Sequence, residues 1–256
     1  MAFTDRPSTE KVLGGVFLAV ILGWAIRFVL AGGVIEYFDS NKRIENEIAA
    51  ALSKEPGTES VLRRLESDFP DKYDEFLATL SNRLNQDQSA NRVAPTAVTW
   101  IRSFFASHEN DFGFAPMPQL DAVIDWEQQF IAKLADENVA SCDAYAIGLP
   151  LEEQPSLEVR ELGAKAVEAR FDAIRAGRKD QQMRLKLNPT DFEAVAVSLA
   201  EKGATRDQIE FAFGDLNGAV LDEGVPCKSL QMLLETIIEQ PEERRALLIG
   251  AYASQG

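Results

Sequence analysis

The chain has 256 residues, of which 46% are hydrophobic and 26% are charged, and it carries a formal net charge of −15. A chain of this length and apolar share can bury a core, so the composition does not indicate disorder. The strong negative charge repels phosphate backbones, which argues against nucleic acid as a partner. His108 is the only histidine. A His-rich metal site is therefore excluded, and we expect no metal and no cofactor.

A short tail over residues 1–11 precedes an apolar run over residues 12–35, in which Arg27 is the only charged residue. As a helix this run would be about 36 Å long, enough to cross a hydrocarbon core of about 30 Å. A cleaved signal peptide is the main alternative, but its apolar region usually spans about 7–15 residues. Because the run continues past Arg27, we predict an uncleaved transmembrane anchor in the lipid bilayer.

Small residues recur at steps of four along the predicted anchor. Gly15, Ala19 and Gly23 form a ridge on one face of the helix, and Arg27 continues it. Such a ridge lets a second membrane helix approach closely. We expect this face to pack on a membrane protein, with Arg27 meeting a carboxylate or a carbonyl there. The alternative is a plain anchor whose arginine reaches to the membrane surface.

The orientation of the anchor has only weak signals. Arg6 and Lys11 precede it and Lys42 and Arg43 follow it, so the positive-inside rule gives almost no bias. An even number of cysteines, two, suits an oxidising compartment. We therefore expect a single-pass membrane protein with its N-terminus in the cytoplasm. In a bacterium this would place the anchor in the inner membrane and the soluble domain in the periplasm.

Beyond the anchor, nearly every apolar residue recurs at helical spacing, and signals for strands are close to absent. The predicted fold class is all-α: one N-terminal transmembrane helix followed by an irregular multi-helix soluble domain. We expect a juxtamembrane helix over 36–55, a helical domain over 56–187 and a C-terminal helical subdomain over 188–256. The last boundary follows the polar stretch 179–189, whose Asn-Pro pair disfavours a continuous helix.

Local signals place two helix starts and one helix end in the C-terminal part. Thr190 with Glu193 and Thr205 with Gln208 each have the spacing of a capping box. Gly203 stands where a glycine would end the intervening helix. We therefore predict helix starts at both threonines.

The two cysteines are Cys142 and Cys227. A disulfide between them would tie the C-terminal helices to the middle of the domain. Two buried free thiols are the first alternative. The second is a redox centre at Cys227, because this residue opens a predicted helix and a helix N-terminus favours a thiolate.

Few other residues have a spacing that suggests chemistry. His108 could act as a base, but it lies at the end of a predicted helix, where histidines commonly interact with the helix dipole. Asp121 and Asp125 share one helix face and could be the paired carboxylates of a glycosidase or of a metal site, yet this spacing is also common on solvated faces. Neither feature forms a catalytic motif.

Aromatic residues gather on one short predicted helix that carries Trp100, Phe104 and Phe105. Exposed, they would form a partner surface. We expect them in the core instead, because large aromatic residues are mostly buried.

The anchor, the small-residue ridge and the lack of a catalytic motif favour a membrane-anchored interaction protein. Its expected role is that of an accessory or assembly subunit of a membrane complex. One alternative is a membrane-tethered cell-envelope enzyme that uses carboxylates. Another is a helical domain that binds a peptide or a lipid.

Overall fold

The computed structural model describes residues 41–54, 57–87, 90–149, 151, 153–184, 187–213 and 222–254. Within these ranges every regular element is an α-helix, which confirms the predicted all-α class. None of the helices in this part of the chain is both long and apolar enough to cross a membrane. The predicted anchor, with Gly15, Ala19, Gly23 and Arg27, lies outside the described residues.

The helices follow the apolar periodicity of the sequence and are joined mostly by short connections. Their bounds are α2 (Asn41–Leu52), α3 (Thr58–Asp68), α4 (Pro70–Asp87), α5 (Ala90–Ala106), α6 (Glu109–Phe114), α7 (Met117–Glu137), α8 (Val139–Ala146), α9 (Leu157–Lys179), α10 (Pro189–Glu201), α11 (Arg206–Ala212), α12 (Val225–Ile238) and α13 (Glu242–Ser254).

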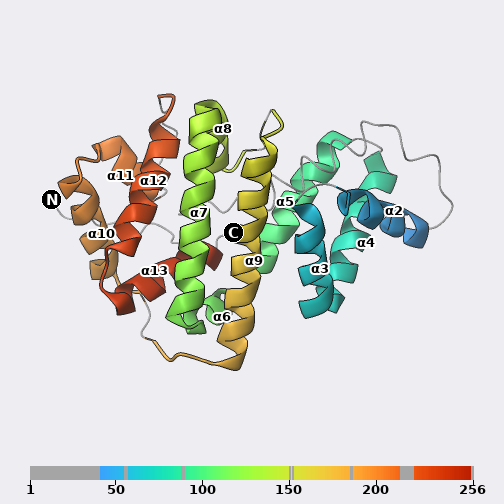
Figure 1. Cartoon of the computed structure of the whole chain (residues 1–256), viewed down its shortest axis with the longest axis horizontal. Helices are drawn as coiled ribbons and strands as arrows, with labels where there is room; N and C mark the ends of the chain where they lie inside the picture. Colours follow the sequence, from blue (N-terminus) through green and yellow to red (C-terminus); the bar gives the residue numbers. More distant parts are fainter. Residues whose placement is uncertain are drawn as a thin grey trace.

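Helices α7 and α9 run side by side through the middle of the molecule (Figure 1). The N-cap of α9, Ser156, donates a hydrogen bond of 2.6 Å to Glu137 at the C-terminal end of α7. This contact shows that the two helices are antiparallel. Helices α2 to α5 lie on one side of the pair and α10 to α12 on the other, so α7 and α9 connect the two ends of the molecule.

The predicted capping box at the start of α11 is confirmed. The Thr205 hydroxyl accepts a hydrogen bond from the backbone N–H of Gln208 over 3.3 Å, and the Gln208 side chain accepts one from Thr205 N–H over 2.8 Å. Gly203 follows α10 with a φ of 84°, the left-handed conformation expected of a glycine that ends a helix.

The predicted start of α10 at Thr190 is wrong, because the helix begins two residues earlier. Its N-cap is Asn188, whose side chain accepts from Thr190 N–H over 2.9 Å, and Asp191 completes the capping box. Pro189 suits the first helical position, since it has no N–H to leave unsatisfied and its φ is already helical. The Asn-Pro pair that ends the preceding connector therefore also begins the helix.

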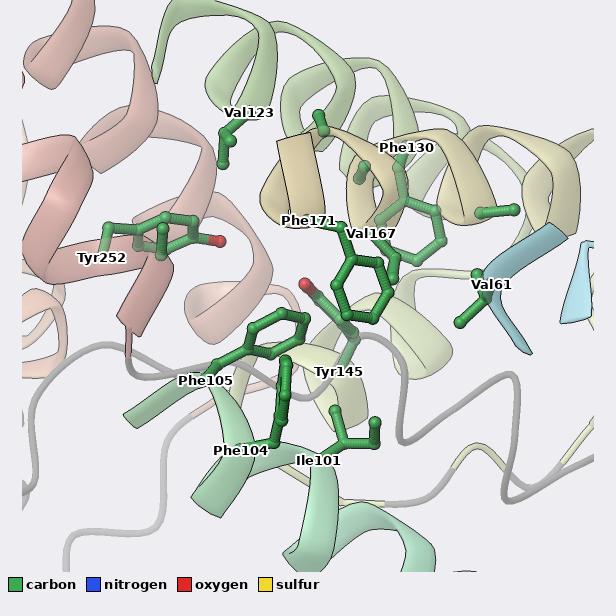
Figure 2. Close-up of a cluster of buried hydrophobic side chains, with 14 of the residues drawn as sticks. Val61, Ile101, Phe104, Phe105, Val123, Phe130, Tyr145, Val167, Phe171 and Tyr252 are labelled. Carbon is green, nitrogen blue, oxygen red and sulfur yellow. The ribbon is translucent and has the colours of Figure 1, made fainter. Parts of the chain in front are cut away.

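A continuous hydrophobic core runs through the described helices. The rings of Phe104 and Phe171 contact each other, and each also contacts the rings of Phe69 and Phe105, with centroids 5.1 to 5.8 Å apart. Figure 2 shows Phe104, Phe105 and Phe171 in this cluster. The expectation of a buried aromatic cluster is confirmed for Phe104 and Phe105. Trp100 lies at the edge of the cluster and is only half-buried.

Candidate functional site

An open groove of about 730 Å³ lies between α7 and α9. Helix α7 presents Pro118, Gln119, Ala122 and Trp126 to it, and α9 presents residues between Lys165 and Asp180. On each helix these residues recur every three or four positions, so each set occupies one face. The groove is therefore built by one stripe from each of two antiparallel helices.

Three alanines lie along the groove: Ala122 on α7, and Ala169 and Ala176 on α9. A methyl group is the smallest side chain that still covers a helix backbone, so the space above these positions stays open. The charged side chains of the walls all come from α9 and the residue that follows it, and they are Lys165, Glu168, Asp172, Arg175, Lys179 and Asp180.

Among the described residues that line the groove, Trp126 is the aromatic one. The Lys165 ammonium lies 4.6 Å from the centre of the Trp126 ring, which is the geometry of a cation–π interaction. This contact joins α9 to α7 across the groove. Because the indole is only half-buried, part of the ring remains open to a ligand.

The charges along α9 are only partly compensated. Asp172 accepts hydrogen bonds from Arg64 over 2.8 Å and from Arg175 over 2.9 Å. Among the described residues, no ion pair is formed by Lys165, Glu168 or Lys179. The middle of this stripe is thus neutralised within the protein, whereas each end carries one charge of either sign: Lys165 with Glu168, and Lys179 with Asp180.

Behind the groove, α7 and α9 are held together by a buried ion pair. Arg170 Nη2 lies 3.2 Å from Glu127 Oε2, and both side chains are fully buried. Tyr145 from α8 and Tyr252 from α13 both donate hydrogen bonds to Glu127 Oε1, the latter over 2.9 Å. Figure 2 shows the two tyrosine hydroxyls pointing toward each other from opposite sides of the core. Four helices therefore meet at this carboxylate.

The protonation states in this cluster follow from burial and charge. Burial, followed by the charge of Glu127, raises the pKa of both Tyr145 and Tyr252 well above the ordinary value, so both remain hydrogen-bond donors. Burial alone would lower the pKa of Arg170, but the neighbouring carboxylate and tyrosines outweigh it and the pKa is raised. The arginine is therefore a permanent cation inside the core.

Arg170 is incompletely satisfied. Within the part of the chain that the structure describes, Nε, Nη1 and Nη2 have no hydrogen-bond acceptor. The contact of Nη2 with Glu127 is close enough for an ion pair but is not aligned as a hydrogen bond. The Arg170 guanidinium also lies 5.7 and 5.8 Å from the ring centres of Phe105 and Tyr252, which adds favourable electrostatics from the ring faces.

A second close contact holds the C-terminal half of α9. A Cβ atom on Gly177 would lie 1.8 Å from the backbone oxygen of Asp111 in α6. Only glycine permits this approach of the two backbones. The ion pair and Gly177 thus fix α9 at two points along the length of the groove.

The predicted pairing of Cys142 and Cys227 is confirmed: the sulfur atoms are 2.03 Å apart and the Cα atoms 5.3 Å apart. The bond joins α8 to the N-terminal end of α12. The neighbouring Asp143 carboxylate accepts hydrogen bonds from Gly224 N–H over 2.6 Å and from Cys227 N–H over 2.9 Å. It caps α12 from another helix. Both cysteines are buried, which suits a structural role.

His108 is buried away from the groove. Its Nδ1 lies 2.9 Å from the Phe104 carbonyl oxygen, and its Nε2 lies 2.8 Å from Arg178 Nη2. An arginine can only donate, so Nε2 is the acceptor and Nδ1 carries the proton. Burial and the charge of Arg178 lower the pKa of His108. A neutral imidazole with both nitrogens engaged is a packing element.

The candidate carboxylates Asp121 and Asp125 do not line the groove. Asp121 lies 3.3 Å from Arg245 Nε, and Asp125 is exposed. Burial raises the pKa of Asp121, while Arg245 opposes this shift. No group of three or more histidine, cysteine or acidic side chains arranged for a metal ion occurs among the described residues.

A comparison of the chain with known protein families, with curated proteins and with solved structures finds no match in any of the three. The function of this chain has therefore to be inferred from its own residues.

Sequence reasoning missed both the groove and the ion pair behind it. A signal for the groove was present: Lys165, Glu168, Asp172, Arg175 and Lys179 follow one another at alternating steps of three and four, with alanines between them. The ion pair had a weaker signal. Glu127 and Arg170 each occupy a position where the helical repeat of the sequence otherwise places an apolar residue. A single charged residue at such a position does not show which residue will pair with it.

Proposed function

We propose that this chain is a membrane-anchored, non-catalytic interaction protein, an accessory or assembly subunit of a membrane complex. The observation that carries the proposal is the groove between α7 and α9, an open surface with uncompensated charges on its wall. In the proposed arrangement, residues 12–35 tether the chain and the Gly15, Ala19, Gly23 and Arg27 face contacts a membrane helix of the partner. The helical domain binds a second part of the same complex.

Binding suits the groove better than hydrolysis does. Two carboxylates line α9 near each other, Glu168 and Asp172, but Asp172 is neutralised by Arg64 and Arg175. A hydrolytic pair needs one carboxylate that can accept or donate a proton beside a second that stays charged. The arginines hold Asp172 in place as part of a wall.

The experiment is purification of the tagged full chain from its native membranes in a mild detergent, with mass spectrometry of the proteins that accompany it. We expect a membrane protein in fixed stoichiometry. Replacing Gly15 and Gly23 together by Leu should reduce its recovery, because the bulkier ridge prevents close helix packing.

The matched control replaces Leu18 and Leu22, which are outside the ridge, by Ile. Recovery with the control should equal that of the unmodified chain. A lone chain, monodisperse and unaccompanied, would overturn the proposal.

A further inference from the structure

The chain contains a single histidine, His108, and its two cysteines are bonded to each other. Histidine is the side chain that ordinarily gains or loses its charge between pH 5 and pH 8. We propose that His108 and Arg178 form an acid-sensitive latch: when His108 takes up a proton, Arg178 is released and the last turn of α9 opens. This behaviour is independent of the anchor and of any partner, so it goes beyond the proposed function.

Arg178 reaches His108 from the last turn of α9. The Arg178 Nη2 group donates a hydrogen bond of 2.8 Å to His108 Nε2, and its Nε group donates one of 3.0 Å to Asp111 Oδ2 in α6. The same guanidinium lies 4.8 Å from the centre of the Phe69 ring, at the end of α3. Arg178 therefore ties the end of α9 to α6 and to the end of α3.

An added proton can only go to the nitrogen that Arg178 occupies. His108 Nδ1 already carries a proton, which it donates to the Phe104 carbonyl oxygen over 2.9 Å. A second proton therefore goes to Nε2, which would then present an N–H group to the guanidinium. Because an arginine can only donate and is always charged, this hydrogen bond would be lost and two cations would face each other.

Arg178 is the member of the pair that can move. The imidazole is buried, and its ring centre lies 4.4 Å from that of Phe104 and 5.4 Å from that of Phe69. The Arg178 side chain is 48% exposed, so its guanidinium can turn into water without leaving a charge buried. We therefore expect protonation to displace the arginine and to leave the imidazole in place.

Among the described residues, three charged groups act on His108, and they come from three helices. Burial and the charge of Arg178 on α9 lower the pKa of His108, and Lys72 on α4 adds to this shift. The Phe104 carbonyl and Asp111 on α6 oppose it. The latch is therefore closed at neutral pH and opens as the pH falls through the lowered pKa. Once Arg178 has left, Asp111 remains as the counterion of the imidazolium.

The opening is confined to the end of α9, which lies beside α6 (Figure 1). Gly177 lies directly against the Asp111 carbonyl, and this backbone contact does not depend on the latch. Beyond Gly177, the turn is tied to α6 through the Arg178 side chain. The residues that follow, Lys179 and Asp180, line one end of the groove. Acid would therefore alter that end of the groove while the helices remain folded.

The test is hydrogen exchange of the full chain in a mild detergent, measured by mass spectrometry between pH 7.5 and pH 5.0. We expect the amides of residues 178–180 to lose protection in acid, by at most about tenfold for each pH unit, because one proton is taken up. Intrinsic exchange also changes with pH, so each variant is compared with the unmodified chain at the same pH. Circular dichroism should show the chain still folded at pH 5.0.

Three variants separate the latch from other effects of acid. His108→Gln keeps an acceptor for Arg178 but does not titrate, so its last turn should stay protected at both pH values. Arg178→Gln should expose the last turn already at pH 7.5. The control Arg206→Gln removes a cation that pairs with Glu210 on α11, and it should retain the acid response of the unmodified chain.

A second measurement needs no variant and serves where His108→Gln does not fold. Because the chain has one histidine, the imidazole signals in a nuclear magnetic resonance spectrum belong to His108. Their titration gives the midpoint of protonation directly. In the unmodified chain this midpoint should coincide with the pH at which residues 178–180 lose protection.

Unchanged protection of residues 178–180 at pH 5.0 would overturn the inference, as would an acid response that persists in His108→Gln. It is also overturned if Arg178→Gln leaves the last turn protected at pH 7.5, or if the two midpoints differ. Unfolding of the whole chain at the pH at which the last turn opens would show a general loss of stability instead of a latch. Each of these results leaves the proposed function intact, because co-purification of a partner tests that separately.

Discussion

Glu127 and Arg170 form an ion pair from which solvent is fully excluded, with Nη2 and Oε2 3.2 Å apart. It links the two central helices on the side opposite the groove, and the hydroxyls of Tyr145 and Tyr252 bring α8 and α13 to the same carboxylate. Removing two charges from water costs several kcal/mol each, and their attraction repays this cost only in part. We therefore expect the pair to restrict which faces of α7 and α9 can meet more than it stabilises the fold.

Arg170→Met should lower the free energy of unfolding by about 3–5 kcal/mol, because Glu127 would remain buried without its counterion. The double variant Arg170→Met with Glu127→Gln removes both charges but keeps a side-chain oxygen that can accept from Tyr145 and Tyr252, so it should recover most of this loss. The measurement is urea unfolding of each variant, followed by circular dichroism. A single variant within about 1 kcal/mol of the unmodified chain would show that the pair contributes little.

His108 should make stability depend on pH. Its pKa in the folded chain is lowered by burial and by Arg178 and Lys72, while the Phe104 carbonyl and Asp111 oppose the shift. The unfolded chain therefore binds a proton near pH 6.5 that the folded chain does not. By linkage, the stabilisation is fully present above this pH and is lost as the pH falls below it, with a slope of at most about 1.4 kcal/mol per pH unit.

The measurement is the free energy of unfolding between pH 7.5 and pH 5.5, compared with that of His108→Gln. Glutamine keeps a donor and an acceptor in the pocket but does not titrate. We expect the pH slope to be smaller in the variant over this interval. Equal slopes in the two proteins would rule out His108 as its source.

The disulfide should raise the free energy of unfolding by about 4 kcal/mol, because it closes a loop between cysteines 85 positions apart. Cys142→Ser with Cys227→Ser should lower the free energy of unfolding by that amount, and a reducing agent should do the same to the unmodified chain. Native material should contain no thiol that reacts with iodoacetamide. Two reactive thiols in the native chain would contradict the pairing.

A separate variant tests the cap beside the disulfide. Asp143→Ala leaves the cysteines in place but removes the acceptor for Gly224 N–H and Cys227 N–H. We expect a loss of about 1 kcal/mol. A loss as large as that of the double serine variant would mean that the cap, and not the bond, holds α12.

Gly177→Ala should destabilise the chain by about 1–3 kcal/mol, because its methyl group would collide with the Asp111 carbonyl and push α9 from α6. Gly113→Ala is the matched control on α6. A Cβ there meets no atom within 4 Å, and alanine favours a helix over glycine by about 0.5–1 kcal/mol. Thermal unfolding should therefore show the two substitutions shifting Tm in opposite directions. Shifts of the same sign would argue against the close contact.

The sequence by itself determined the secondary structure of the described part. Apolar periodicity and the lack of strand signals predicted helices, because a helix must bury one stripe and the period of that stripe is local information. The capping box predicted for Thr205 and Gln208 was correct for the same reason, because a capping box involves only residues that are close in the chain. For α10 the sequence offers two helix-start signals, one at Asn188-Pro189 and one at Thr190. The helix begins at the first of them, with Asn188 as its N-cap.

Only the tertiary structure decided which side chains meet. The number of cysteines made a disulfide plausible, but its formation required α8 and α12 to lie side by side. The burial of Glu127 and Arg170 depends on four helices converging, and the groove depends on the faces that α7 and α9 leave uncovered. The spacing of apolar residues in the sequence shows which residues share one face of a helix. This spacing does not show which other helix that face will contact, because the contact is determined by the packing of the whole core.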